Sequence, residues 1–268
     1  MMTNYEKVVD FNKCFGSYLS EKEDPLLYNK LPKLVNLKYS LIKEEVDELL
    51  EAFNDNNLIE IIDALSDIKY VLYGMASGFG VNMDTEFLKY LCSKPKLQNT
   101  KLEYEDKSDF RIVVEIYLSD FSNRLHYPQD YLSNIVKPYF NQALQHYIDV
   151  INKCCNTLKE TVIGCDFKAM KQELCSLLYN VNIFGAIIGI DLDQAFDIVH
   201  SSNMTKVCKD EETAKKTVTW YLENDKRYKT PTYLKNEYGY IIINQDTGKV
   251  LKSIEYTPAN FLELLVEN

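Results

Sequence analysis

Acidic side chains recur on one face of two neighbouring predicted helices within residues 41–84. These acids are Glu44, Glu45, Glu48, Glu60, Asp63 and Asp67. Side chains three, four or seven positions apart share one face of a helix, because each residue turns the chain by about 100°. The opposite faces are apolar and suit a core. A short connection at residues 54–57 predicts an antiparallel helix hairpin, which would place the acids in one cleft.

The spacing of these acids favours a metal site over a solvated acidic face, which stays open as the alternative. Solvated helix faces commonly place Lys four residues from Glu, which stabilises the helix. Here Glu48 follows Glu44, and Asp67 follows Asp63, at that same spacing. Each like-charge pair costs about 0.2–0.5 kcal/mol, and a bound cation would relieve the repulsion. Mg²⁺ prefers carboxylate and phosphate oxygens as ligands, and Mn²⁺ also suits them, so the pattern indicates such a site.

The acids belong to a longer series of motifs. E-E-x-x-E at 44–48 is followed by D-A-L-S-D-I-K-Y-V-L-Y-G at 63–74 and by G-V-N at 80–82. In this order the motifs resemble the all-α nucleoside triphosphate pyrophosphohydrolases, the superfamily of MazG-like proteins and dimeric dUTPases. The resemblance implies a Mg²⁺-dependent hydrolase that converts a (d)NTP to a (d)NMP and pyrophosphate. It makes a pyrimidine deoxynucleotide such as dUTP the first substrate to test.

The resemblance also implies roles for individual acids. The implied metal ligands are Glu45, Glu48, Asp63 and Asp67. Glu44 is implied as the catalytic base that activates water, or as a further ligand. The usual second motif is E-x-x-D, and its Glu would fall on Ala64. We take Asp63 as the replacement, which leaves the number of metal ions open. It also leaves open a nucleotide- or metal-binding protein without catalytic activity.

A second stretch of the chain repeats the first with residue numbers shifted by 109. Residues 63–87 align without gaps on residues 172–196, so that Gly80 meets Gly189. The acids are lost in the second copy, where Asp67 meets Ser176. Retention of the packing pattern without the acids indicates that the acids serve chemistry rather than folding. The fold class predicted is mainly α: a helical bundle of two tandem MazG-like repeats, forming a pseudo-dimer, with a small C-terminal β-hairpin. Chance similarity between amphipathic helices is the alternative.

The repeat divides the chain into three predicted regions. Residues 1–100 form the acid-bearing repeat, residues 101–208 the degenerate repeat, and residues 209–268 a helix with a β-hairpin tail. The polar run 94–108 is the expected linker. The expected helices span 5–16, 27–53 with a bend near Pro32, 58–79, 85–93 and 209–224. The expected hairpin pairs 238–243 with 249–253, and a last helix is expected to begin at Thr257–Pro258.

The second copy ends in a motif that the first copy lacks. FDIVHSSNMTK, which ends at Lys206, is similar to the V-H-x-[SA]-N-x-[ST]-K motif of single-copy relatives. The resemblance implies that Asn203 contacts the sugar or base and that Lys206 neutralises phosphate. Acids in one copy and Asn and Lys in the other would form one composite site. The alternative is an ordinary capped helix end with a surface Lys. We expect His200 to make a structural hydrogen bond.

The C-terminal tail carries two further predicted substrate contacts. TGKVLKSIEYTP resembles the tail of the family and contains Lys249 and Lys252. The resemblance implies that both side chains face the triphosphate. Solvated lysines on an edge strand are the alternative, because edge strands are commonly protected by lysine.

Composition limits the remaining possibilities. The net charge of −10 argues against general nucleic-acid binding, and the 7 Cys without a C-x-x-C motif predict free thiols in a reducing compartment. The N-terminus lacks an apolar signal core, and no apolar run is long enough to span a membrane. We therefore expect a soluble, cytoplasmic protein with a nucleoside triphosphate substrate. No nucleic-acid or membrane partner is expected, and the protein should be a monomeric pseudo-dimer or a homodimer.

Overall fold

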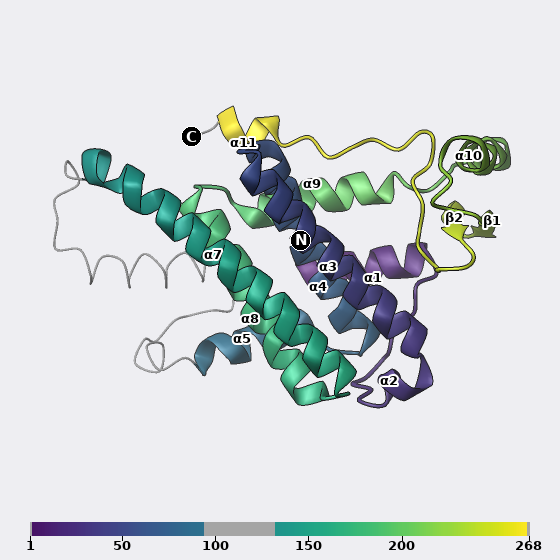
Figure 1. The fold of residues 1–268 in the computed structure, drawn as a ribbon. Helices are drawn as coiled ribbons and strands as arrows, with labels where there is room; N and C mark the ends of the chain where they lie inside the picture. Colours follow the sequence, from purple (N-terminus) through teal and green to yellow (C-terminus); the bar gives the residue numbers. More distant parts are fainter. Residues whose placement is uncertain (1, 94–131, 267–268) are drawn as a thin grey trace.

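The computed structural model describes residues 2–93 and 132–266 as a helical bundle with a small hairpin (Figure 1). The helices are α1 (Asn4–Cys14), α2 (Leu27–Lys30), α3 (Pro32–Asn54), α4 (Leu58–Gly78), α5 (Met83–Cys92), α7 (Leu132–Ile163), α8 (Phe167–Ile187), α9 (Leu192–Met204), α10 (Glu211–Asn224) and α11 (Leu262–Val266). Strands β1 (Pro231–Asn236) and β2 (Gly239–Asn244) pair antiparallel. The expected fold class, mainly α with a C-terminal hairpin, is confirmed. The expected linker 94–108 lies outside the described residues.

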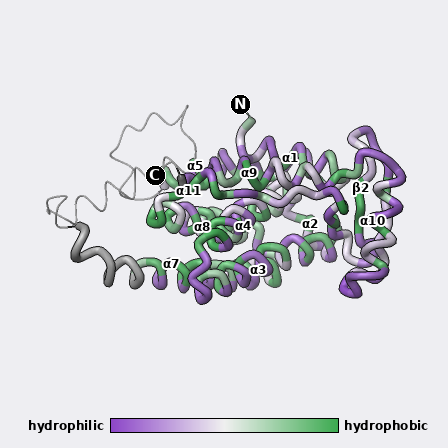
Figure 2. The backbone as a smooth tube through the Cα atoms, turned by 90° about the horizontal axis from the view of Figure 1, so that it is seen from above, coloured by the Kyte–Doolittle hydropathy of each residue, from purple (hydrophilic) through white to green (hydrophobic). Residues whose placement is uncertain are grey.

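Helix α4 occupies the centre of the bundle and contacts α1, α3, α5, α8 and α9. Its side chains are buried almost throughout, and they join residues of α8 in one continuous apolar core. Leu65 of α4 and Leu174 of α8 are both fully buried there. Apolar residues gather on these two helices in the middle of Figure 2, whereas α10 at the end of the molecule is more polar. The core therefore spans the first and second halves of the chain.

The two halves share helix boundaries at the predicted shift of 109. Helix α3 ends at Asn54 and α7 ends at Ile163, and α4 and α8 each begin four residues later. Residues in the left-handed region also correspond, since Asn56 has φ of 53° and Cys165 has φ of 52°. Each connection then leads into a side-chain N-cap, Asn57 or Asp166. The backbone therefore has equivalent helix ends, left-handed residues and N-caps at the shift of 109, as a repeat would have.

A buried ion pair joins α4 of the first half to α9 of the second half. The Lys69 ammonium is fully buried and lies 2.5 Å from Asp193 Oδ1, with Asn182 Oδ1 at 3.4 Å. The same Asp193 oxygen accepts a hydrogen bond of 2.7 Å from the amide of Asn4. Loss of one partner would leave an uncompensated buried charge, which is strongly destabilising. The pair thus fixes how the two halves meet.

The predicted hairpin is confirmed only in part, because the main partner of β2 is β1, a strand that was not predicted. Strand β2 pairs with β1, and Asn236 faces Gly239 across a turn of two residues. The stretch 249–253 instead runs beside the other edge of β2, with one isolated bridge from Val250 to Ile243. The Asn236 side chain closes the β1–β2 turn by accepting a hydrogen bond of 3.0 Å from Tyr238 N. Sequence reasoning missed this turn because it lacks the Asn-Gly or Asp-Gly signature of two-residue hairpins.

Other predicted elements were closer to the structure. The expected bend near Pro32 is confirmed as a break between α2 and α3, with Pro32 at the first position of α3. The last helix was misplaced, since α11 begins at Leu262 and not at Pro258. All seven cysteines are free, and five of them are buried. No single described helix is long and apolar enough to cross a membrane, although α8 and α9 meet the criteria together across a bend of 108°.

We predict that the equivalent glycines Gly80 and Gly189 differ in their tolerance of alanine. Both have positive φ, of 71° and 77°. A Cβ on Gly80 would lie 2.1 Å from the carbonyl oxygen of Lys22, whereas Gly189 has no described atom within 4 Å of a Cβ. Gly189→Ala should therefore cost only the left-handed strain, about 1–2 kcal/mol. Gly80→Ala should cost clearly more in urea denaturation, and equal costs would contradict this account.

We predict that Lys38 makes stability rise with pH. Burial lowers the pKa of Lys38 to about 8 from its ordinary value of 10.5, and its ammonium donates a hydrogen bond of 2.7 Å to Gly74 O. Between these two values the unfolded chain binds the proton and the folded chain does not, so the free energy of unfolding increases with pH. In denaturation between pH 7 and 10, where Lys206 and Glu45 also titrate, the slope of unfolding free energy against pH should be less positive in Lys38→Met than the wild-type slope. Lys33→Met, at an exposed position of α3, serves as the control and should retain it.

Candidate active site

The acids of α3 and α4 face one another across the helix hairpin. Glu45 on α3 and Asp67 on α4 are both half-buried. Burial raises the pKa of Glu45, and the negative charge of Asp67 is the next largest cause. The charges of Glu48 and Glu44 raise that pKa further. Carboxylates of two different helices therefore lie in one place, and we call Glu44, Glu45, Glu48, Asp63 and Asp67 the acid cluster.

Position 63, and not position 64, lies on the acid side of α4. Ala64 is only 4% exposed and packs in the core. Burial and the charge of Glu60 raise the pKa of Asp63, while Lys252 and Lys206 oppose the shift. Burial and the charge of Asp63 in turn raise the pKa of Asp67. This arrangement agrees with Asp63 as the replacement for the missing Glu. Its role as a metal ligand stays a prediction.

Three lysines from the last third of the chain surround the acid cluster. Lys249 Nζ donates hydrogen bonds of 2.9 Å to both carboxylate oxygens of Glu44. Burial lowers the pKa of Lys206 to about 8, and the charge of Asp67 opposes this shift. Lys252 lies near enough to lower the pKa of Glu48 and of Asp63. We call Lys206, Lys249 and Lys252 the lysine group. The role of these lysines as substrate contacts stays a prediction.

Asn203 and His200 both bind the hydroxyl of Tyr70, one turn of α4 after Asp67. The hydroxyl lies 3.1 Å from Nδ1 of His200, and the side chain of Asn203 also forms a hydrogen bond with it. The expected structural hydrogen bond of His200 is thus confirmed. Asn203 is 7% exposed. Tyr70 therefore holds Asn203 against the helix that carries Asp67, while the sugar or base contact of Asn203 stays a prediction.

Sequence reasoning missed this role of Tyr70. The available signal was the spacing D-x-x-Y, which puts Tyr70 on the same face of the helix as Asp67 and one turn further along. Lys249 contacts Glu44 while both side chains stay partly exposed, so its alternative as a solvated edge-strand lysine stays open. Lys252 Nζ lies 4.6 Å from the centre of the Tyr256 ring, so its stem is also packed.

The chemistry of the acid cluster suits a hard divalent cation, whereas the present positions of its side chains do not form a complete metal site. The acid cluster offers only carboxylate oxygens, which are the ligands Mg²⁺ prefers. Mutual repulsion raises the pKa of Glu45 and of Asp67 in addition to burial, so additional positive charge would stabilise the ionised cluster. However, no three Asp, Glu, His or Cys side chains of the described residues converge closely enough to hold a metal ion. The metal site therefore stays a prediction.

The second half carries neutral groups at the positions that correspond to Glu45 and Asp67. Cys154 corresponds to Glu45 and Ser176 corresponds to Asp67, and the Cys154 sulfur lies 3.5 Å from the Ser176 hydroxyl. The pairing between the two helices is thus kept while its charge is absent. Both groups can remain buried without a cation, because neither a thiol nor a hydroxyl is charged at neutral pH.

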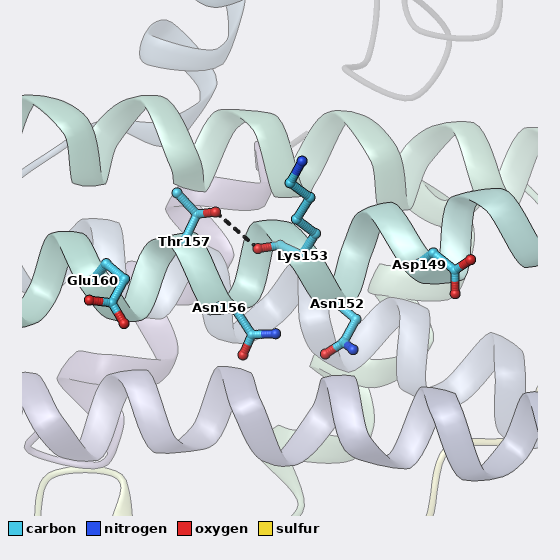
Figure 3. A pocket seen from close by; sticks show the side chains of 6 residues that line it. All are labelled: Asp149, Asn152, Lys153, Asn156, Thr157 and Glu160. Atoms are coloured by element: carbon cyan, nitrogen blue, oxygen red, sulfur yellow. Dashed lines mark hydrogen bonds between the residues drawn. The ribbon is translucent and has the colours of Figure 1, made fainter.

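A polar depression of about 440 Å³ lies along α7 in the same half (Figure 3). It is lined by Asp149, Asn152, Lys153, Asn156, Thr157 and Glu160. Lys153 and Thr157 correspond to Glu44 and Glu48 of the acid cluster. The Thr157 hydroxyl donates a hydrogen bond of 3.1 Å to the Lys153 carbonyl within the helix, as Figure 3 shows. All six side chains come from one helix, so the depression is a surface feature of α7 and not a second acidic cleft.

Comparisons with known proteins place the chain in a family. Residues 8–89, which carry the whole acid cluster, match the family of phosphoribosyl-ATP pyrophosphohydrolases. Over 269 aligned positions the chain is 31% identical to "Uncharacterized protein L479" of Acanthamoeba polyphaga mimivirus, covering 98% of this chain and 96% of that protein. No solved structure matched significantly. We conclude that the chain belongs to the same family as this mimivirus protein, and that its residues 8–89 are similar to the phosphoribosyl-ATP pyrophosphohydrolases, a family of the all-α MazG-like superfamily.

Proposed function

We propose that the protein is a Mg²⁺-dependent nucleoside triphosphate pyrophosphohydrolase with one composite active site. The observation that carries this proposal is the meeting of the acid cluster with the lysine group. Lys249 donates a hydrogen bond to Glu44. Lys206 is close enough to Asp67 for the negative charge of Asp67 to raise its pKa against the effect of burial. Carboxylates suit Mg²⁺ and lysines suit phosphate oxygens, so the two groups together suit a metal-bound triphosphate. The family match at 8–89 supports pyrophosphohydrolase chemistry in the same region.

Each part of the site has a chemical role in this proposal. Glu45, Glu48, Asp63 and Asp67 would hold Mg²⁺, which polarises a phosphoryl group and lowers the pKa of water when bound. Glu44, an exposed acid beside this set, accepts the proton of the attacking water. Both of its carboxylate oxygens accept hydrogen bonds from Lys249, so Lys249 must transfer to a phosphate oxygen before Glu44 can accept a proton. Attack at the α-phosphorus then releases pyrophosphate.

The other side chains position the substrate in this proposal. The lysine group neutralises the phosphates, and Asn203, held by Tyr70, contacts the sugar or base. A pyrimidine deoxynucleotide such as dUTP is the first substrate to test. Phosphoribosyl-ATP is the second, because the matching family is named for its hydrolysis.

The tandem repeat is part of the same proposal. We infer that the second half is a degenerate copy that serves as scaffold and supplies Asn203 and Lys206 to the single cleft. The shared helix boundaries, the left-handed residues Asn56 and Cys165, and the neutral Cys154–Ser176 pair support this reading. A non-catalytic nucleotide-binding protein is the alternative, and Ala64 in place of the usual Glu is the observation that favours it.

We predict that purified protein with Mg²⁺ releases pyrophosphate, and not orthophosphate, from at least one nucleotide in a panel of (d)NTPs and phosphoribosyl-ATP. Glu48→Gln should lower kcat/KM by about 10²-fold or more, because it removes one charged oxygen ligand from the cluster. Glu51→Gln is a matched control on the same helix, at an exposed position outside the cluster. It should leave activity unchanged. Absence of turnover, with nucleotide-dependent thermal stabilisation retained, would favour the non-catalytic alternative.

We predict that Glu45→Gln stabilises the protein in the presence of a chelator. The substitution removes a carboxylate whose pKa is raised by burial and by neighbouring acids. The gain should be at least about 1 kcal/mol in the free energy of unfolding, since one unit of pKa corresponds to about 1.4 kcal/mol. Added Mg²⁺ should stabilise the wild type more than the variant, because the variant has lost a ligand.

Chemical denaturation with EDTA and with Mg²⁺ measures both effects. Glu51→Gln again provides the control, and its effect should stay within about 0.5 kcal/mol in either buffer, as is usual at exposed sites. Equal stabilisation of the wild type and Glu45→Gln by Mg²⁺ would count against Glu45 as a ligand.

A further inference from the structure

Helix α4 has a single partly exposed line along its length. Between residues 61 and 79 every side is buried except at four positions, which are Asp63, Asp67, Val71 and Gly74. These positions follow one another at intervals of four, four and three residues, so they lie on one side of the helix. The line begins with two members of the acid cluster and continues beyond them. A ligand can therefore reach α4 beyond the acids only over Val71 and Gly74.

Gly74 leaves an open space on this line. Apart from its chain neighbours and the nearby backbone of its own helix, no described atom lies within 4 Å of the position that a Cβ on Gly74 would take. A Cβ leans toward the N-terminal end of its helix, so this space lies on the side of Gly74 that is nearer to Asp67. Its floor on α4 is a glycine with the apolar Val71 beside it, and not a further acid.

A buried lysine of α3 closes the far end of this space. Lys38 donates a hydrogen bond of 2.7 Å to Gly74 O, and its Cε would lie 2.7 Å from a Cβ on Gly78, one turn further along α4. Lys38 comes seven residues before Glu45, and Gly74 comes seven residues after Asp67. Antiparallel helices keep such pairs at matching levels, and seven residues of helix span about 10 Å. The Lys38–Gly74 contact thus lies two turns from the level of the Glu45–Asp67 pair, along the same two helices.

The ammonium of Lys38 has hydrogen-bonding capacity to spare. It has three N–H donors, and the bond to Gly74 O uses one of them. In the described parts of the chain no carboxylate forms an ion pair with Lys38, and burial alone accounts for its lowered pKa. Burial of a cation without a partner is costly, so an oxygen acceptor that entered the space over Gly74 would be stabilised by Lys38.

The two directions from the acid cluster along α4 differ in polarity. Toward the start of the helix, residues 58–60 are exposed, so a group bound there stays in contact with water. In the other direction the line passes over Val71 and Gly74 and ends at the buried Lys38. Phosphates are costly to remove from water, whereas a flat base gains from burial of its faces. The base of a nucleotide held at the acid cluster therefore suits the space over Gly74.

We propose that the space over Val71 and Gly74 receives the base of the nucleotide, and that Lys38 donates to a carbonyl oxygen of this base, so that keto bases are preferred to amino bases. Uracil presents a carbonyl oxygen at the edge where cytosine presents an amino group. An ammonium donates to such an oxygen and cannot accept from an amino group. This inference rests on the proposed function, from which it takes the nucleotide, and it adds a specificity-determining residue.

The test measures, by calorimetry in Mg²⁺, the binding of the α,β-imido analogues of dUTP and dCTP, which differ only in the base. The wild type should bind the dUTP analogue about tenfold or more tightly, the usual effect of one hydrogen bond to a charged group. Lys38→Met keeps the length of the side chain but has no donor, so it should reduce this ratio to about twofold or less. Lys33→Met, at an exposed position of the same helix, should keep the wild-type ratio.

A second variant tests the space without removing Lys38. Gly74→Leu places a side chain in the open space, and leucine is favoured over glycine within a helix, so the fold should be retained. The variant should bind both nucleotide analogues about tenfold or more weakly, as is usual when the shape of a pocket changes. Tripolyphosphate, which has no base, should bind to Gly74→Leu as it binds to the wild type. This probe shows whether the acid cluster is intact.

The outcomes separate this inference from the proposed function. Equal affinity of the wild type for the two analogues, or an unchanged ratio in Lys38→Met, overturns the role of Lys38. Normal nucleotide binding by Gly74→Leu, or an equal loss of tripolyphosphate binding, overturns the placement of the base. If these results occur while the wild type releases pyrophosphate, the proposed function stands alone. If the preference depends on Lys38 but no nucleotide is hydrolysed, the inference stands and the catalytic proposal fails. A wild type that binds neither analogue overturns both.

Discussion

The mutual repulsion of carboxylates between α3 and α4 is the constraint on which the rest of the site depends. Glu45 and Asp67 lie on different helices, and each is partly removed from water. A nearby negative charge favours the protonated form of a carboxyl group. The pKa of Glu45 and the pKa of Asp67 are both raised, first by burial and then by the charges of neighbouring acids. The helix hairpin keeps the acids together regardless, because the opposite faces of both helices are buried in the core.

Positive charge for this cluster comes from distant parts of the chain. Lys206 follows α9, while Lys249 and Lys252 follow the hairpin, and all three reach the cluster only through tertiary packing. Burial makes the ammonium of Lys206 easier to deprotonate, and the nearby charge of Asp67 counteracts this effect. The lysines and acids thus oppose, without cancelling, the shifts that burial imposes on one another's pKa values.

Packing between the halves positions these groups. Helix α4 is the central element, since it bears acids on one face and apolar contacts with α8 and α9 on the others. The buried Lys69–Asp193 pair and the contact of Tyr70 with His200 and Asn203 both join α4 to α9. Because Lys206 follows α9 directly, the same contacts that join the halves also place a cation beside Asp67. The site therefore depends on the same packing contacts that form the core.

Several features were predictable from the sequence because they depend on local periodicity and capping. The acids recur at helical spacing, Pro32 and Asn57 mark helix starts, and the repeated turn residues Gly80 and Gly189 both adopt positive φ. The same spacing places the acids of α3 on one face of that helix and the acids of α4 on one face of that helix. The helix ends of α3 and α4 were correct to within one residue for this reason.

Only the tertiary structure decided the features that depend on pairing between distant segments. Strand β2 pairs along its whole length with β1 and forms only one bridge to the stretch 249–253, and the tail brings Lys249 to Glu44. Such choices depend on which surfaces meet after the helices have packed, and no local pattern encodes them. The sequence by itself thus determined which residues have the chemistry, and the packing of α4 against α9 and the tail determined which of them meet in one site.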